Sequence, residues 1–170
     1  MVKGPIDTRH AVQRGGFAGI TAGVVLTLIM TVMSAAAGKD VWYGIKGAAA
    51  PFMRERAMSP GFDLPAVILG FGTHLVVSAV WGILFAIVFY GFDRMAKIVG
   101  GVLWGIVVWL GMYYLVLPAV GLSSMQSDAP VSRAIMFHLI FSVIMTAAYM
   151  VYPRLFEHGG PHIGRSAPAV

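Results

Sequence analysis

Residues 64–91 read LPAVILGFGTHLVVSAVWGILFAIVFYG and contain no Asp, Glu, Lys or Arg. A transmembrane helix needs roughly 20 consecutive apolar residues, so this stretch is long enough to cross a bilayer with some tilt. Residues 17–37, 99–120 and 134–152 have the same character. Long uninterrupted apolar runs are typical of helices and not of the alternating strands of a membrane barrel. The sequence therefore predicts an all-α integral membrane four-helix bundle.

The composition of the 170-residue chain supports this class. Apolar residues make up 58% and charged residues 11%, with a mean hydropathy of +0.81, whereas soluble domains are about 25% charged. These values exclude a disordered chain, a coiled coil and an ordinary soluble enzyme. The absence of cysteine excludes disulfides, thiolate metal sites and cysteine nucleophiles. The net charge of +5 indicates loops that face anionic lipid, not nucleic acid.

The distribution of Lys and Arg predicts the topology. With the N-terminus inside, seven of the twelve lie on the inner side: Lys3, Arg9, Arg14, Arg94, Lys97, Arg154 and Arg165. The outer side then holds Lys39, Lys46, Arg54, Arg56 and Arg133. We therefore expect two cytoplasmic tails, residues 1–16 and 153–170.

The first outer connection is more than a plain linker. Residues 41–58 read VWYGIKGAAAPFMRERAM and mix aromatic with cationic side chains, which suits a helix lying at the membrane interface. Pro51 is expected to break that helix. The segment is either an interfacial connector or a cover over a site between the helices.

Two helix beginnings share a pattern, D-x-P-x(7 or 8)-H-L-x-x-S. One copy has Asp63-Leu64-Pro65 before His74, and the other has Asp128-Ala129-Pro130 before His138. The repeat predicts two tandem, parallel two-helix hairpins. His74 and His138 would then lie at nearly one depth, in the outer half of the bilayer.

These two histidines allow several functions, because an ionisable residue within a span is a candidate functional group. In the structural interpretation they hold helices together, with Ser78 and Ser142 four residues later on the same faces. In the second they ligate haem b from opposite sides, with Gly70 and Gly72 giving room to the macrocycle and Arg133 meeting a propionate. In the third they handle protons or quinone.

Glycines follow a separate pattern. Gly15, Gly19 and Gly23 form G-x-x-x-G-x-x-x-G in the first span, and Gly101 and Gly105 continue the theme in the third. Small residues at this spacing let helix backbones approach closely, within the bundle or against a partner.

Motifs for catalysis are absent from the sequence. It contains no Ser-His-Asp arrangement, HExxH, Walker A motif or dinucleotide fingerprint. We expect no catalytic residue and no metal site. The leading interpretation is a small accessory, structural or assembly subunit of a larger membrane complex, such as a respiratory one, with a membrane-protein partner or a second copy.

Two alternatives remain open at this point. One is an electron-transfer subunit that binds haem b or quinone through His74 and His138. The other is a small transporter or channel component, although no charged residue lies deep in any span, which argues against an ion-coupled carrier working alone.

The motif Pro60-Gly61-Phe62-Asp63, followed by His74-x-x-x-Ser78-x-x-Trp81-Gly82, resembles small four-span bacterial inner-membrane proteins of uncharacterised function. The resemblance covers residues 15–152 and implies a four-helix protein of the bacterial inner membrane, without an established chemistry. Some of these proteins have an automatic sodium:proline symporter label. Four spans in 170 residues cannot build the large inverted-repeat carrier which that label names.

Overall fold

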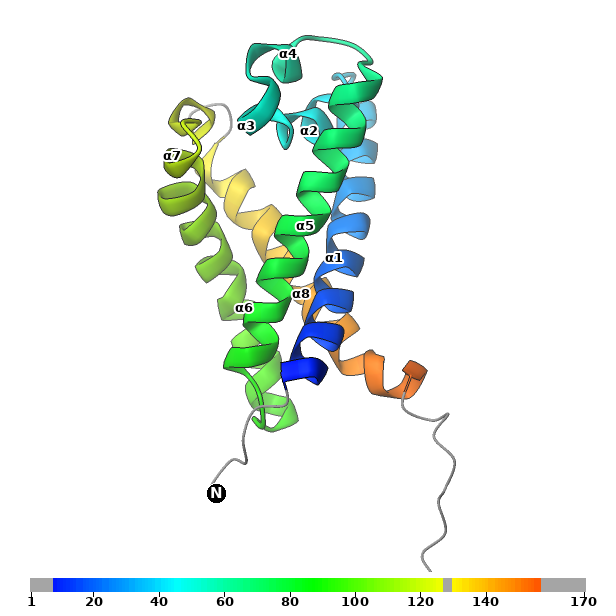
Figure 1. Cartoon of the computed structure of the whole chain (residues 1–170), viewed down its shortest axis with the longest axis vertical. Coiled ribbons are helices and arrows are strands. Elements are labelled where there is room, and N and C mark those ends of the chain that lie inside the picture. The colour runs from blue at the N-terminus through cyan, green and yellow to red at the C-terminus, as the bar shows by residue number, and fades with distance from the viewer. Residues whose placement is uncertain (1–7, 127–129, 157–170) are drawn as a thin grey trace, which may run out of the picture.

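The computed structural model describes residues 8–126 and 130–156, and these ranges contain four long helices (Figure 1). They are α1 (Thr8–Ala36), α5 (Leu64–Val88), α6 (Arg94–Gly111) and α8 (Val131–Phe156). Each provides or begins a segment long and apolar enough to cross a membrane: Ala11–Ala36, Leu64–Val88, Arg94–Ala119 and Val131–Tyr152. The prediction of an all-α four-helix membrane bundle is confirmed. Asp128 of the repeat motif lies outside the described residues, as do residues 1–7 and 157–170 of the expected tails.

Short helices follow α1 and α6 at one end of the bundle. Between α1 and α5 lie α2 (Tyr43–Gly47), α3 (Ala50–Met53) and α4 (Glu55–Met58). Between α6 and α8 lie the π-helical turn η1 (Met112–Val116), α7 (Leu117–Ala119) and the 3₁₀ turn η2 (Ser123–Gln126). We call residues 38–62 the cap, because Figure 1 shows α2–α4 across this end of the long helices.

Local chemistry sets where the long helices begin. Asp63 caps α5 by accepting a hydrogen bond from Ala66 N at 3.2 Å, and Asp93 caps α6 by accepting one from Ala96 N at 2.8 Å. The second cap starts α6 at residue 94, before the expected boundary at 99. Helix α1 starts at Thr8, well before the expected residue 17, because its first turns are packed: Ala11 is only 3% exposed.

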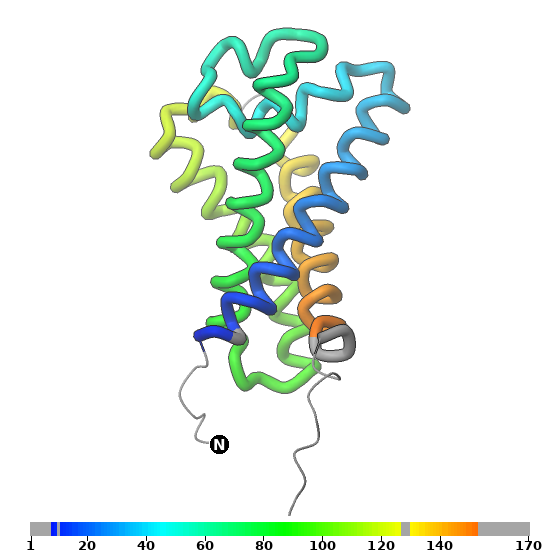
Figure 2. Tube along the Cα trace, turned by 45° about the vertical axis from the view of Figure 1, so that its right-hand side comes forward, coloured from blue at the N-terminus to red at the C-terminus, as the bar shows by residue number. Residues whose placement is uncertain are grey.

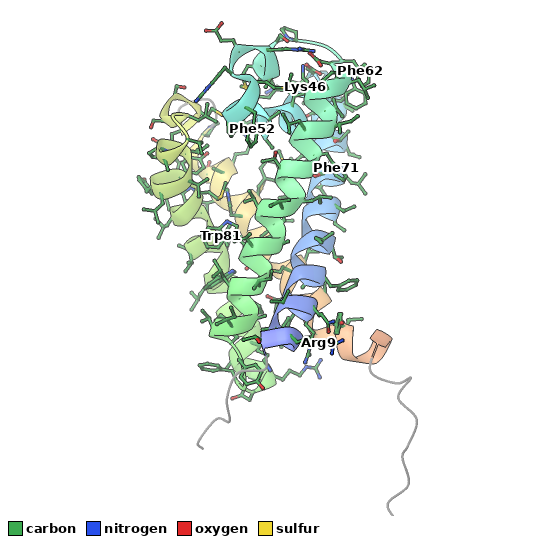
Figure 3. The ribbon with its side chains drawn as sticks, in the orientation of Figure 1. Arg9, Lys46, Phe52, Phe62, Phe71 and Trp81 are labelled. Carbon is green, nitrogen blue, oxygen red and sulfur yellow. The ribbon has the colours of Figure 1, made fainter. Side chains whose placement is uncertain are left out.

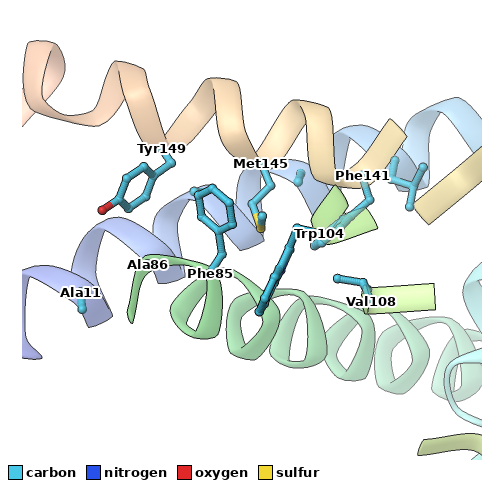
Figure 4. Packing of buried hydrophobic residues seen from close by; sticks show 11 residues of the cluster. Ala11, Phe85, Ala86, Trp104, Val108, Phe141, Met145 and Tyr149 are labelled. Atoms are coloured by element: carbon cyan, nitrogen blue, oxygen red, sulfur yellow. The ribbon is translucent and has the colours of Figure 1, made fainter. Parts of the chain in front are cut away.

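The four long helices pack in the order α5, α1, α8, α6. Helix α1 contacts both α5 and α8, and α8 contacts α6 (Figure 2). Helices α5 and α6 meet chiefly through large side chains such as Trp81, Phe85 and Trp104. At the end opposite the cap, Phe85 of α5 packs against Trp104 of α6 at 6.0 Å and Tyr149 of α8 at 5.5 Å between ring centroids (Figure 4). Aromatic side chains therefore fill the core between the two hairpins. Within each hairpin the helices are closely packed.

Within the first hairpin, α1 and α5 touch backbone to backbone. A Cβ added to Gly15 would lie 2.7 Å from the Cα of Ile83, and one added to Gly82 would lie 2.8 Å from the Cα of Gly19. Gly23 faces Ser78 and Leu75. A side chain at any of these positions fits only if the two helices move slightly apart.

The second hairpin repeats these contacts. A Cβ on Gly101 would lie 2.9 Å from the Cβ of Thr146, and one on Gly105 would lie 2.9 Å from the Cα of Leu139. Leu75 follows His74 and meets Gly23, just as Leu139 follows His138 and meets Gly105. The two hairpins thus share a packing pattern as well as a sequence pattern.

We expect Gly19→Ala to destabilise the protein by about 1–3 kcal/mol, because the added methyl overpacks the α1–α5 contact. The matched control is Gly16→Ala on the same helix, where an added Cβ meets nothing within 4 Å. That change should be neutral or stabilising by up to about 1 kcal/mol, because alanine favours helix. Unfolding in mixed detergent micelles measures both, and equal effects would contradict the packing described.

Candidate functional site

The structure brings His74 and His138 into one region, between the cap and the aromatic core. His74 Nε2 lies 3.3 Å from the carbonyl oxygen of Gly23 on α1. His138 Nδ1 lies 2.7 Å from the carbonyl oxygen of Ala134, one turn earlier on its own helix. The ring of Tyr113 in η1 meets that of His138 edge-on, with 6.3 Å between the ring centroids.

The two histidines make different hydrogen bonds despite their equivalent places in the repeat. His74 joins α5 to α1 across a helix–helix contact, whereas the bond of His138 closes within α8. In both, the ring nitrogen donates to a carbonyl when it bears the proton. Only His74 acts as a direct link between helices.

The serines of the repeat lie on the glycine contacts. Ser142 is fully buried and its hydroxyl donates to the carbonyl of Gly101 on α6. Ser78 is 3% exposed and lies against Gly23 of α1. Both serines therefore support packing inside a hairpin.

A small cavity lies beside His74. Its volume is about 50 Å³, and it is bounded by α1, α5 and the start of the cap: Thr27, Met30, Thr31, Ser34, Val41, Gly44, Ile45, Phe71 and His74. Thr27 donates to the same Gly23 carbonyl that His74 faces, at 2.8 Å. A water molecule requires about 10–15 Å³ measured in this way, so the cavity can hold a few waters or a very small polar ligand.

The packing around His74 bears on the haem hypothesis. Gly70, expected to give room to a macrocycle, is covered by α2, and a Cβ there would lie 3.3 Å from the Cα of Lys46. Gly72 has open space, with nothing within 4 Å, and Arg133 lies in the first turn of α8. Gly70 therefore offers no room to a macrocycle while α2 lies against it.

The cap is built around a buried cation. Lys46 has no exposed surface, and its ammonium donates to the carbonyls of Ser59 and Gly61, the latter at 2.5 Å. Asp40 lies 3.8 Å from the ammonium and accepts from the backbone N–H groups of Trp42 and Gly61, both at 2.9 Å. These bonds tie the beginning of the cap to its end, and Figure 3 labels Lys46 within it.

The cap is also attached to both hairpins. Arg56 pairs with Asp63 at the start of α5 at 2.8 Å, and Arg54 donates to the carbonyl of Val120 after α7 at 2.9 Å. Arg54 adopts a positive φ of 51°, a strained value for a residue with a side chain. Apolar contacts reinforce the second attachment, where Ala49, Ala50 and Ala57 pack with Leu122 and Met125. The cap thus connects the two hairpins through polar and apolar contacts.

Hydrogen bonds keep the cap carboxylates ionised. The backbone N–H of Trp42 does most to lower the pKa of Asp40, and the Gly61 N–H and the Lys46 ammonium act in the same direction. The pKa of Asp63 is lowered chiefly by its hydrogen bond from Arg56 and then by the Ala66 N–H. Because folding lowers both pKa values, their stabilisation is present above the ordinary value of 3.8 and is lost as the pH falls below it.

The sequence pattern did not identify Lys46 and Asp40 as partners within this region. A signal for Lys46 was present, since it lies between Gly44 and Gly47 and precedes three alanines, a segment without a polar face. Among the described residues, no three His, Asp or Glu side chains are grouped as a metal site would require.

Comparisons of the chain with protein-family models, curated proteins and solved structures find no match.

We expect Lys46→Met to loosen the cap and to cost about 3 kcal/mol, because it leaves Asp40 and two carbonyls without their buried cation. Backbone hydrogen exchange of residues 38–62 should rise while that of α8 stays unchanged. Lys39→Met, at an exposed position of the same connection, is the control. Unchanged exchange in the Lys46 variant would refute the role assigned to this lysine.

Acidification should weaken the same network. We expect the melting temperature to fall between about pH 4 and about pH 2, because protonated Asp40 no longer accepts both N–H bonds or pairs with Lys46. Asp40→Asn should be less stable than the wild type at neutral pH and should show a smaller drop over this interval. An equal drop in both proteins would show that Asp40 is not responsible.

Proposed function

We propose that the protein is a non-catalytic accessory or assembly subunit of a larger complex in a bacterial inner membrane. The observation that best supports this role is where the polar side chains inside the spans make their contacts. His74, Ser78, Ser142 and Thr27 all lie on backbone contacts within the hairpins. Groups used in this way hold helices together and leave little polar chemistry for a substrate.

The outer surface of the bundle suits lipid and protein neighbours. All four long helices expose large apolar side chains, including Val32 (66%), Ile68 (64%), Leu103 (61%) and Val143 (52%). Such a surface is stable only in lipid or against another apolar surface. The glycines of the packing motif lie at contacts inside the bundle and are not available to a partner. A partner would therefore bind the exposed faces that carry these larger apolar side chains.

The proposed topology has both termini in the cytoplasm. The start of α1 and the end of α8 lie at the same end of the bundle, opposite the cap (Figure 1). The cap and the start of α5 contain Lys39, Lys46, Arg54 and Arg56 together with Asp40, Glu55 and Asp63, whereas the starts of α1 and α6 contain Arg9, Arg14, Arg94 and Lys97 with Asp93. The excess of positive charge favours this end as the inner one.

The apparent size of the extracted protein tests the assembly role. A chain tagged at its native locus and extracted in mild detergent should migrate on a blue native gel well above its own mass of 18.2 kDa plus micelle. Substitution of an exposed apolar face, for example Val32→Gln with Leu28→Gln, should change this migration if α1 provides the contact. Migration as a monomer at native expression levels would overturn the proposal.

Substitution of the two histidines distinguishes a structural role from electron transfer. We expect His74→Ala to cost about 1–2 kcal/mol because it breaks a bond between helices, and His138→Ala to cost less because its bond lies within one helix. The reduced-minus-oxidised spectrum should show no band near about 560 nm, where haem b absorbs. A stoichiometric band, abolished by either substitution, would replace the accessory role with electron transfer.

A further inference from the structure

The cavity beside His74 is polar along one wall. Thr27, Thr31 and Ser34 line it and are spaced four and three residues apart on α1, so their hydroxyls share one face of that helix. Leu28 and Val32, which lie between them in the sequence, are 61% and 66% exposed and are not part of the lining. Helix α1 therefore has a hydroxyl-bearing face toward α5 and the cap, and an apolar face toward lipid.

The cavity extends along α1 toward the cap. Thr27 and Ser34 are seven residues apart, which corresponds to about 10 Å along a helix. Ser34 lies two residues before the end of the candidate span Ala11–Ala36, and the exposed, charged Lys39 follows soon after it. None of the lining residues is fully buried, and Gly44 at the cap side is exposed. The polar wall thus leads from inside the span to the level where the span meets water.

The opposite end of the cavity is closed by the contact between α1 and α5. A Cβ on Gly23 would lie 2.7 Å from the hydroxyl oxygen of Ser78 and 3.2 Å from a methyl carbon of Leu75. One turn further, a Cβ on Gly19 would lie 3.0 Å from the Cα of Ala79. Between these described residues the helices touch closely enough to exclude water, so the cavity ends at the level of Gly23.

The size of the cavity fits a short chain of waters. Its volume of about 50 Å³ corresponds to about three to five waters at about 10–15 Å³ each. Three waters joined to polar groups at both ends make four hydrogen bonds of about 2.8 Å and span about 11 Å, which matches the length of the wall. Thr27 donates to the Gly23 carbonyl at 2.8 Å, and the lone pairs of its hydroxyl oxygen remain available to water.

The hydrogen bond of His74 determines which ring nitrogen can take up a proton. Nε2 lies 3.3 Å from the carbonyl oxygen of Gly23, and a carbonyl only accepts, so Nε2 carries the hydrogen of the neutral ring. Nδ1 then has the lone pair. It can accept a proton from water while Nε2 keeps its bond to α1.

The elements packed around His74 contain few other ionisable groups. Helix α1 has none after residue 14, and α5 has none besides His74. Helix α2 contains Tyr43 and Lys46, and the Lys46 ammonium is already held by two carbonyls of the cap. Helix α8 provides His138, whose bond closes within its own helix. Water in the cavity is therefore the best placed group to exchange a proton with His74.

We propose that the cavity holds a short chain of waters that connects Nδ1 of His74 to the aqueous phase at the cap end, so that His74 takes up and releases a proton from that side of the membrane. The proton moves from water to Nδ1, and the positive charge resides on the ring, whose Nε2–H still donates to Gly23. An ionisable side chain that faces a water-filled cavity within a span is typical of proton-handling sites. The passage is independent of the accessory role proposed above, because it lies within one hairpin and its cap and needs no partner.

Cysteine accessibility tests the water chain in this cysteine-free protein. Thr31→Cys and Val32→Cys are compared in lipid nanodiscs, where both ends of the protein face water, with a charged methanethiosulfonate reagent. The thiolate is the reacting form and apolar surroundings suppress it, so Thr31→Cys should react at least about tenfold faster than Val32→Cys. Residue 32 lies nearer the end of the span, so depth alone would favour the opposite order.

Thr27→Cys and Leu28→Cys repeat this comparison one turn deeper, and they decide the matter if Thr31→Cys does not fold. Here again the cavity-lining position lies further from the end of the span than its exposed neighbour. The cavity-lining cysteine should again react faster. A reaction equal to or slower than that of the neighbouring lipid-facing cysteine would overturn the proposal.

Gly44→Val tests whether protons reach His74 by this route. A Cβ at this position would lie 3.1 Å from the terminal carbon of Met30, so the new side chain narrows the passage. Exchange of the His74 Cε1 hydrogen with solvent deuterium, read by mass spectrometry, should become slower, while that of His138 should stay unchanged. Exchange at His74 that is unaffected by Gly44→Val would also overturn the proposal.

Discussion

Direct backbone contact between α1 and α5 is the constraint on which the rest of the structure depends. Inside a bilayer, helices gain nothing from leaving lipid, so close van der Waals contact must hold them together. Gly15, Gly19 and Gly82 permit that contact because each lacks the Cβ that would collide with the opposite helix. Helix α1 also packs on α8, and α8 packs on α6 with Gly101 and Gly105 between them. One type of contact, used twice, thus holds together the α1–α5 pair and the α6–α8 pair.

The contact between α5 and α6 differs from the other three helix–helix contacts of the bundle. Helices α5 and α6 lack a glycine contact of this kind, and aromatic rings such as Phe85 and Trp104 fill the space between them away from the cap. At the other end the cap bridges the two hairpins and is held by a buried lysine. Charged side chains pair with one another within the cap, and aromatic rings fill the contact between the hairpins away from it.

The sequence predicted the parts of this structure that depend on local pattern. The four spans follow from apolar run length, the hairpin pairing from the repeat, and the glycine positions from their spacing. The burial of Lys46 was not predictable in the same way, because it depends on carbonyls of Ser59 and Gly61 that reach it only after the cap folds. The unequal bonds of His74 and His138 also escaped prediction, since a repeat specifies position and not which carbonyl lies nearby. The cavity beside His74 joins residues of α1, α5 and the cap, which no sequence spacing reveals.

Cysteine cross-linking tests the central claim most directly, because the chain has no cysteine of its own. A Cβ on Gly15 would lie 2.8 Å from the Cβ of Ala86, and one on Gly101 would lie 2.9 Å from the Cβ of Thr146. Small adjustments bring both pairs to the Cβ separation of a disulfide, about 3.8 Å. The account predicts that Gly15→Cys/Ala86→Cys and Gly101→Cys/Thr146→Cys each form an intramolecular disulfide in native membranes, whereas Gly16→Cys/Ala86→Cys does not. Failure of both pairs, or equal cross-linking of the Gly16 pair, would contradict the packing on which the account rests.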